Sequence, residues 1–265
     1  MHWIIGDIHG MLAPLETLLA EIDRRDAGRK LIFAGDYINR GPDSKRVIDL
    51  LLTLKDTRFV RGNHDDVFDQ VLHDVSYSGK PGEYDRVAAF KWFMNFGLFQ
   101  TFRSYGVDED DLLRADERAS ARILDELAAA VPEEHHVFLK DLAPVVDEND
   151  FFVVHAKWDV GDGTESPSIG AQAAAKPKLR QTLVWGRFTP AEIAAEKAWG
   201  RRGYFGHTSV MAYAEHTVPV PIVGPGIVLV DTGAALPEGR RLTAYCHETN
   251  EFVQADARGR LVEGF

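Results

Sequence analysis

The sequence predicts an α/β fold in which short apolar strands alternate with amphipathic helices. Three observations support this prediction: apolar runs stop at a glycine and a polar residue, leucine and valine then recur at helical spacing, and the unit repeats along the chain. A crossover helix connects neighbouring parallel strands, so the pattern implies parallel or mixed pairing. Ligands of open α/β sheets collect outside the carboxyl ends of the strands. The polar residues after the apolar runs are therefore the first candidates for a functional site.

The composition is that of an ordinary soluble globular protein. The chain has 265 residues, of which 45% are hydrophobic and 27% are charged. Its 30 basic and 41 acidic residues give a net charge of -11, which argues against a protein that binds the phosphate backbone of a nucleic acid. The sequence contains no apolar run of about 18 residues and no secretory signal, so we expect a cytoplasmic protein that does not cross a membrane. The single cysteine, Cys246, fits a reducing compartment.

The first unit consists of a strand at residues 3–5, the turn Gly6-Asp7-Ile8-His9-Gly10 and a helix over residues 15–22. Asp7 and His9 are two positions apart, so in extended backbone they project on the same side, as two ligands of one metal ion would. The unit therefore places two candidate ligands between a strand and a helix.

The second unit contains a strand at residues 31–34, the turn Gly35-Asp36-Tyr37-Ile38-Asn39-Arg40-Gly41 and a helix over residues 47–54. Glycine lets the backbone of such a turn bend or approach a ligand closely, while Asp36 supplies hard oxygen ligands. Arg40 offers a planar guanidinium that fits phosphate. The turn therefore combines a candidate metal ligand with a candidate phosphate ligand.

The third unit begins with a strand at residues 58–61 and continues into Gly62-Asn63-His64-Asp65. Asn63 and His64 are then expected at the same edge of the sheet as the candidate ligands of the first two units. For Asp65 two interpretations stay open, because an aspartate here can orient a neighbouring imidazole or close the turn.

Residues 67–150 interrupt this alternation and are predicted to form a mainly helical insertion that shapes one wall of the crevice. Aromatic residues of the insertion are interpreted as core rather than as a stacking platform. These residues are Phe90, Trp92, Phe93, Phe96, Phe99 and Phe102. The acidic run at residues 108–111 is interpreted as a solvated helix start, because carboxylates suit the helix dipole there, and a helix is expected over residues 119–131. We expect residues 1–265 to form a single domain that contains this insertion.

Strands are predicted again in the later part of the chain. The apolar runs and the residues that follow them are 151–154 with His155, 182–185 with Gly186-Arg187, and 203–205 with Gly206-His207-Thr208. Residues 226–233 and 241–246 are predicted to form a closing antiparallel ribbon, in which Asp231 is structural. A loop rich in glycine, serine and proline is expected at residues 160–177.

The residues at the strand ends provide oxygen and nitrogen donors and no thiolate. They are Asp7, His9, Asp36, Asn63, His155 and His207. This set suits manganese, iron or zinc rather than a structural zinc finger. Six protein ligands with a central aspartate predict two metal ions that share Asp36 and a bridging water or hydroxide. Each residue alone would more often be structural, and it is their ordered recurrence at strand ends that favours a metal site.

These motifs resemble the five ordered blocks of the calcineurin-like metallophosphoesterases. The blocks are Gly6-Asp7-Ile8-His9-Gly10, Gly35-Asp36-Tyr37-Ile38-Asn39-Arg40-Gly41, Gly62-Asn63-His64-Asp65, His155-Ala156 and Gly206-His207-Thr208. Within that superfamily the chain is most similar to the bacterial serine/threonine protein phosphatase type branch, which includes symmetrical diadenosine tetraphosphatases. The resemblance implies a four-layer α/β/β/α sandwich. It also implies a division of the ligands: one metal is held by Asp7, His9 and Asp36, and the other by Asp36, Asn63, His155 and His207.

The resemblance also implies catalytic roles. Arg40 and Arg61 match phosphate-contacting arginines of the family, and Arg187 matches by position alone. His64 is expected to be the general acid that protonates the leaving oxygen. Asn39 stands where many members have an aspartate, and asparagine cannot supply the negative charge that raises an imidazole pKa. We therefore expect a preference for leaving groups that need little protonation, such as phenolate from phosphotyrosine or a nucleotide, over the alkoxide of serine.

Three functions follow as hypotheses. The leading one is a phosphomonoesterase that uses two divalent metal ions, with manganese favoured over iron or zinc, and acts on a phosphoprotein or a small phosphate ester. The second is a symmetrical bis(5'-nucleosyl)-tetraphosphatase with the same metals and different pocket walls. The third is a non-catalytic binding module that keeps the fold, and the complete set of ligands together with His64 argues against it.

Overall fold

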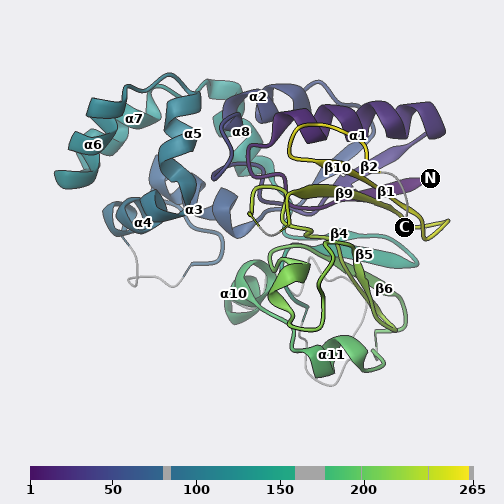
Figure 1. Ribbon diagram of the computed structural model, residues 1–265. Coiled ribbons are helices and arrows are strands. Elements are labelled where there is room, and N and C mark those ends of the chain that lie inside the picture. Colours follow the sequence, from purple (N-terminus) through teal and green to yellow (C-terminus); the bar gives the residue numbers. More distant parts are fainter. Residues whose placement is uncertain (80–84, 159–176, 198, 238, 263–265) are drawn as a thin grey trace.

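Strands that are apolar along their whole length must be covered on both faces. The computed structural model, which describes residues 1–79, 85–158, 177–197, 199–237 and 239–262, achieves this with two five-stranded sheets that lie face to face. Helices cover the outer face of each sheet (Figure 1). The predicted four-layer α/β/β/α arrangement is therefore confirmed.

The first sheet has the strand order β10-β9-β1-β2-β3. Its strands are β1 (His2–Ile5), β2 (Lys30–Phe33), β3 (Thr57–Phe59), β9 (Arg241–Cys246) and β10 (Phe252–Asp256). The pairs β1–β2 and β2–β3 are parallel, and the helices α1 (Leu12–Arg25) and α2 (Ser44–Leu51) make the crossovers between them. The three predicted strand–turn–helix units at the start of the chain are therefore present.

The second sheet has the strand order β4-β5-β6-β8-β7. Its strands are β4 (Val146–Asp147), β5 (Phe151–Val154), β6 (Arg202–Phe205), β7 (Ile222–Val223) and β8 (Ile227–Leu229). The three central strands β5, β6 and β8 are parallel. The helices α10 (Pro177–Trp185) and α11 (Pro190–Ala194) lie on its outer side, away from the first sheet (Figure 1). A short 3-10 helix, η2 (Val210–Ala212), follows β6.

Alternating side chains of each strand belong to two different cores. Ile4 and Ile32 lie between the sheets, whereas their neighbours Trp3 and Phe33 pack with the helices over the first sheet. In the second sheet Phe152 packs outward into a third cluster, which includes residues of α10 and α11. This alternation fixes the strand register, because a shift by one residue would exchange the two faces.

The stretch of chain between β3 and β4 is mainly helical, in agreement with the helical insertion predicted at residues 67–150. It begins with α3 (Asn63–His73) and continues through α4 (Arg86–Phe93), the π-type turn η1 (Met94–Leu98), α5 (Phe99–Ser104), α6 (Glu109–Glu117), α7 (Ala121–Ala128) and α8 (Glu133–Asp141). The acidic run starts α6, where the Asp108 side chain accepts a hydrogen bond from the Asp110 backbone. Helices α4 to α7 extend beside the first sheet (Figure 1).

Two aromatic residues of the insertion do not belong to the core. Phe90, Phe93 and Phe102 are buried as expected, but Trp92 is 38% exposed and Phe96 is 42% exposed. The aromatic residues extend from α4 through η1 into α5, and a helical segment at the surface presents one face to solvent. The interpretation of the whole cluster as core is therefore wrong for these two residues.

Two strand predictions are also wrong. Residues 182–185 belong to helix α10, where Leu179 and Leu183, one turn apart, are both buried in the outer core of the second sheet. A short apolar run cannot be distinguished from a buried helical turn by periodicity alone. The predicted ribbon is not formed either, because β8 lies beside β6 in the second sheet while β9 lies between β1 and β10 in the first. The predicted loop at residues 160–177 falls almost wholly outside the described residues.

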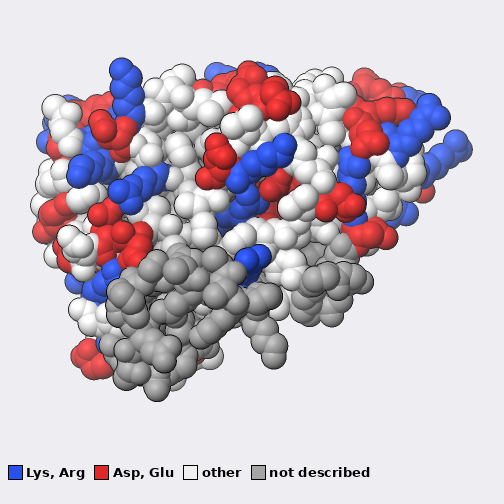
Figure 2. Space-filling model, turned by 180° about the vertical axis from the view of Figure 1, so that it is seen from behind, with Lys and Arg blue, Asp and Glu red and all other residues white. Residues whose placement is uncertain are grey.

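Acidic and basic side chains are interspersed over the described part of the face shown in Figure 2. The charge is thus spread over that face rather than gathered into one field of a single sign. None of the described helices has the length and apolar character needed to cross a membrane.

Candidate metal centre

The loops after five strands bring the predicted ligands to one place between the carboxyl edges of the two sheets. Asp7 and His9 follow β1, Asp36 follows β2, and Asn63 begins α3 after β3. From the second sheet, His155 follows β5 and His207 follows β6. Five of the six side chains are buried and His207 is half-buried.

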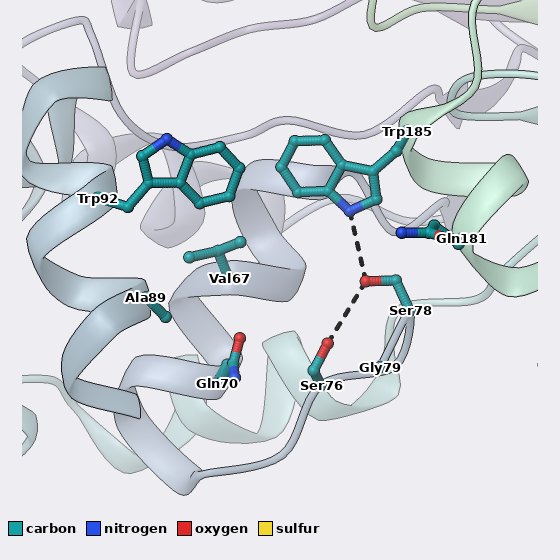
Figure 3. Close-up of a pocket in the computed structure, with 9 residues that line it drawn as sticks. All are labelled: Val67, Gln70, Ser76, Ser78, Gly79, Ala89, Trp92, Gln181 and Trp185. Carbon is teal, nitrogen blue, oxygen red and sulfur yellow. Dashed lines mark hydrogen bonds between the residues drawn. The ribbon is translucent and has the colours of Figure 1, made fainter. Parts of the chain in front are cut away.

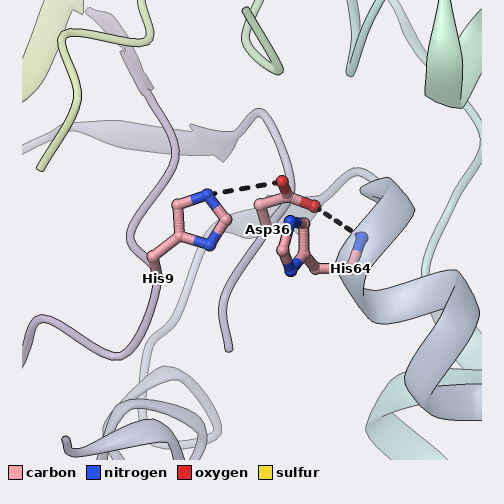
Figure 4. A group of neighbouring side chains, drawn as sticks. All are labelled: His9, Asp36 and His64. Atoms are coloured by element: carbon pink, nitrogen blue, oxygen red, sulfur yellow. Dashed lines mark hydrogen bonds and ion pairs between the residues drawn. The ribbon is translucent and has the colours of Figure 1, made fainter. Parts of the chain in front are cut away.

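Asp36 lies at the centre of this group. One of its carboxylate oxygens, Oδ2, is 3.5 Å from His9 Nε2, and the other, Oδ1, is 3.5 Å from His155 Nε2. Oδ1 also accepts a hydrogen bond of 2.9 Å from the backbone N–H of His64. Figure 4 shows Asp36 between His9 and the first turn of α3, which carries His64. The two oxygens of Asp36 therefore face two different histidine ligands.

Asn63 connects the histidines of the second sheet. Its Oδ1 lies 2.9 Å from His155 Nε2 and 2.8 Å from His207 Nδ1. Candidate ligand atoms of Asp36, His155 and His207 all lie within 4.8 Å of one another, and those of His9, Asp36 and His64 form a second such group. Asp36 is common to both groups, so the geometry offers two adjacent cation positions.

The donor set fits divalent cations. Asp7 Oδ1, His9 Nε2 and His207 Nε2 are buried without a hydrogen-bond partner among the described residues, although buried polar atoms are normally paired. Nδ1 of His9 lies 3.0 Å from the Ile38 carbonyl oxygen, and Nδ1 of His155 lies 2.8 Å from the Ala34 carbonyl oxygen. Backbone contacts of this kind fix the imidazole ring and direct Nε2 toward a metal ion. These residues could therefore hold the metal ions that the donor types predict.

The electrostatics of the site lead to the same interpretation. Burial, together with the nearby Asp231 and Asp36 carboxylates, raises the pKa of Asp7 well above its usual range, and burial raises the pKa of Asp36 to about 7. Burial lowers the pKa of His155 to about 4 and that of His9 well below its usual range. Neutral imidazoles are the form that binds metal, and a divalent cation supplies the positive charge that buried carboxylates require.

The turns that carry these ligands have an unusual backbone. His9, Asp36, Asn39, Arg40 and His207 all have positive φ, with values from 48° to 71°. Non-glycine residues seldom adopt this conformation, and it persists only where the surroundings impose it. The strain is concentrated at the residues that the sequence marks as candidate ligands and phosphate contacts.

Asp65 holds the turn around Asp36. Its carboxylate accepts hydrogen bonds from the backbone N–H groups of Asp36 (2.8 Å), Tyr37 (3.1 Å) and Gly62 (3.0 Å). Of the two interpretations left open by the sequence, these contacts favour closure of the turn. Asp231, interpreted as structural, is buried and accepts a hydrogen bond from the Gly233 backbone at 2.9 Å.

The three predicted arginines have different surroundings. Arg40 Nη2 is 3.4 Å from His64 Nε2, and the exposed Arg187 donates to Thr208 Oγ1 at 2.9 Å. Arg61 is buried, and its guanidinium donates to Asp69 Oδ2 at 2.8 Å and to the Leu139 carbonyl at 2.6 Å. These contacts link the segment after β3 to α3 and α8. The phosphate contact that the resemblance implies for Arg61 stays a prediction.

Asn39 belongs to a hydrogen-bond network that the sequence does not reveal. Its Nδ2 is 2.8 Å from His64 Nδ1, and its Oδ1 accepts a hydrogen bond of 2.7 Å from Thr101 Oγ1. The Asn39 backbone N–H also donates to Thr101 Oγ1 and to Ser44 Oγ, at 3.0 and 3.1 Å. Ser44 and Thr101 lie on α2 and α5 and carry no motif, so only the three-dimensional structure identifies them as neighbours of the site.

Comparison with known proteins places the chain in a family. The family model described as calcineurin-like phosphoesterase matches residues 3–184. Over 64 residues the chain is 45% identical to the symmetrical bis(5'-nucleosyl)-tetraphosphatase of Cellvibrio japonicus, a segment that covers 24% of each chain. The chain thus spans about a quarter of the length of that relative.

Solved structures share the fold. The cold-active protein-tyrosine phosphatase of a psychrophilic Shewanella has a TM-score of 0.52 and 15% identity, with 98% of this chain and 79% of that chain covered. The metallophosphoesterase from Sphaerobacter thermophilus has a TM-score of 0.50 and 17% identity, with 99% and 88% covered. Because the family model covers more than half of the sequence, the chain belongs to the calcineurin-like phosphoesterase family.

Proposed function

We propose that the protein hydrolyses phosphoesters at a centre of two divalent metal ions. The ligands in this proposal are Asp7, His9, Asp36, Asn63, His155 and His207. The observation that carries it is the position of Asp36, whose two carboxylate oxygens lie 3.5 Å from His9 Nε2 and 3.5 Å from His155 Nε2. Manganese is the proposed metal, with iron or zinc as alternatives, because the donors are oxygen and nitrogen without thiolate.

The chain's own residues supply phosphate binding and proton transfer. Two divalent cations, when bound, neutralise charge on the phosphate and lower the pKa of water enough to provide a nucleophile at neutral pH. The Arg40 guanidinium, 3.4 Å from His64 Nε2, is placed to bind a phosphate oxygen beside that imidazole. His64 is the proposed general acid, which gives its proton to the leaving oxygen. Arg187, which is exposed and donates to Thr208 Oγ1 next to His207 in the chain, is a second candidate phosphate ligand.

A phosphomonoester, either a phosphoprotein or a small phosphate ester, is the leading substrate class. Symmetrical dinucleoside tetraphosphate is the second candidate, and the name of the Cellvibrio japonicus relative favours it. Both reactions need the same metal ligands, so the choice between them depends on the walls of the site. A non-catalytic binding module is disfavoured because six donors, an acid and two cationic side chains gather at one centre.

A hydrolysis panel tests this proposal. The purified chain would be incubated with manganese and with an aryl phosphate, phosphoserine and phosphotyrosine peptides, and a dinucleoside tetraphosphate. The Asp36→Asn variant should lose about 100-fold or more of any activity, because it removes the charge shared by the two metal positions. Asp56→Asn is a matched control, since Asp56 is exposed and has a similar positive φ of 53°. Equal activity of wild type and Asp36→Asn would refute the proposed centre.

A further inference from the structure

A pocket of about 230 Å³ lies between helices α3, α4 and α10. Its lining residues combine aromatic and aliphatic walls with hydroxyl and amide groups. They are Val67, Gln70, Ser76, Ser78, Gly79, Ala89, Trp92, Gln181 and Trp185. In Figure 3 the two tryptophans lie along one side of the pocket, and Gln70 and Ser76 lie opposite them.

Helix α3 carries residues of both the metal centre and the pocket. Val67 and Gln70 follow Asn63 at spacings of four and seven residues, which places all three on one face of the helix. The first residue of this series belongs to the candidate metal centre and the other two line the pocket. On α10, Gln181 and Trp185 are likewise four residues apart and both line the pocket.

Trp185 also joins the two sites directly. Its ring centroid is 6.1 Å from that of His207, a candidate metal ligand, and 5.6 Å from that of Trp92, with the two indole planes inclined by only 18°. Phe93 extends the aromatic surface toward the general acid, with its ring centroid 5.0 Å from that of His64. A flat group that stacks against this surface would lie close to a phosphate at the metal centre.

The polar side of the pocket is held in a defined geometry. The buried Asp66 carboxylate accepts hydrogen bonds from Ser76 Oγ at 3.0 Å and from Ser78 Oγ at 2.5 Å. Trp185 Nε1 donates in turn to Ser78 Oγ at 3.4 Å. The serine hydroxyls and one indole edge are therefore fixed to each other before any ligand binds.

We propose that this pocket binds the nucleobase of a nucleotide substrate whose phosphate lies at the metal centre. The inference rests on the proposed function and names the substrate class of that site. Indole rings stack on the faces of nucleobases. The amide of Gln181, which lines the pocket, can donate to and accept from the edge of a base.

A phenyl ring fits the pocket less well. It would cover the Gln181 amide without offering it a hydrogen-bond partner, and burial of a polar group without a new partner is unfavourable. The polar lining therefore favours a nucleobase over the phenol ring of phosphotyrosine, although both rings could stack on Trp92.

The test measures binding to the full chain stripped of metal ions, so that it does not depend on catalysis. Titration calorimetry would compare adenosine monophosphate with phenyl phosphate. Trp92→Ala should weaken binding of the nucleotide about tenfold, the loss typical of one stacking partner. Gln181→Leu should weaken the nucleotide more than phenyl phosphate. Leu113→Ala, which removes a side chain that is 51% exposed on α6, should leave both affinities unchanged.

The outcomes separate this inference from the proposed function. Circular dichroism would check the fold of each variant. If Trp92→Ala does not fold, the result for Gln181→Leu tests the inference by itself. Equal weakening of both ligands by Gln181→Leu, or none, would overturn the nucleobase assignment. Hydrolysis of glycerol phosphate by the manganese-loaded wild type tests the proposed function by itself. If that hydrolysis fails while the variants still weaken nucleotide binding, the pocket assignment holds and the proposed function is lost.

Discussion

The candidate metal centre consists of buried and half-buried side chains at the ends of strands, whereas the pocket beside it is formed by helices and residues 76–79 and includes Trp92, which is 38% exposed. Strands of both sheets fix the centre, and its turns have positive φ at several ligands. The pocket depends on helices of the insertion and on α10. The difference suggests a division of labour, in which the sheets position the chemistry and the helices select what is attached to the phosphate.

One helix belongs to both regions. Asn63 and His64 at the start of α3 contribute to the metal centre, and Val67 and Gln70 further along the same helix line the pocket. Changes that disturb α3 as a whole should therefore affect both regions together, and changes confined to one region should separate them. The predictions below use this contrast, from the largest expected effect to the smallest.

Arg61→Met should have the largest effect, because Arg61 holds α3 against α8 through Asp69 and the Leu139 carbonyl. Removal of one partner of a buried ion pair typically costs about 3–5 kcal/mol of unfolding free energy. Chemical denaturation would measure this loss, with Arg58→Met as the control, since Arg58 lies three residues earlier, on β3, and its side chain is 58% exposed. Unchanged stability with an increased KM for all phosphate esters would instead support the phosphate contact expected from the sequence.

Added manganese should stabilise the chain by about 2.7 kcal/mol at a concentration of 100 times its Kd, because it binds the folded state alone. Asp36→Asn should abolish most of this stabilisation, while Trp92→Ala should change it little, since only the first belongs to the metal centre. Thermal unfolding with and without manganese would measure both. Equal loss in the two variants would mean that the centre and the pocket are not independent.

Gly97→Ala should lower stability by less than Arg61→Met and should also raise KM. Gly97 in η1 has a φ of +94°, and a Cβ atom there would lie 2.0 Å from the Arg40 backbone nitrogen. We expect a loss of about 1–3 kcal/mol in stability and an increased KM, because the turn that carries Arg40 must move. Gly106→Ala is a matched control, since Gly106 has a similar φ of +89° with nothing within 4 Å of the added atom. Equal losses would assign the whole effect to the backbone conformation.

The two regions also differ in how far the sequence predicts them. Polar residues after apolar strands identify Asp7, Asp36 and His155 as neighbours, because the carboxyl ends of parallel strands meet at one edge. The same reasoning misassigned residues 182–185, since a short apolar run fits a buried helical turn as well as a strand. It also missed the pocket, because Trp92 and Trp185 meet only through the packing of two helices that are distant in sequence.

Contacts between the metal centre and helices away from the strand ends could not be predicted from the sequence either. Thr101 lies 62 residues after Asn39 in the sequence. A hydrophobic pattern along the chain cannot predict that a helical hydroxyl contacts a turn so far away in the sequence. The pairing of β8 and β9 was misassigned for a related reason. Both strands have buried hydrophobic side chains on both faces, so their sequences contain no signal of which sheet each would join.

Asn39→Asp should have the smallest effect and should act on the metal centre alone. The carboxylate would keep the Thr101 contact and place a negative charge where Asn39 Nδ2 now lies, 2.8 Å from His64 Nδ1. A nearby negative charge raises an imidazole pKa, which makes the proton of the general acid available to poorer leaving groups. The ratio of phosphoserine to phosphotyrosine hydrolysis should therefore rise, by at most about tenfold for a pKa change of one unit. Asn95→Asp, at an exposed position of η1, controls for added charge near the site. An unchanged ratio would show that Asn39 positions His64 without setting its acidity, and the choice of leaving group would then have to come from the walls of the pocket.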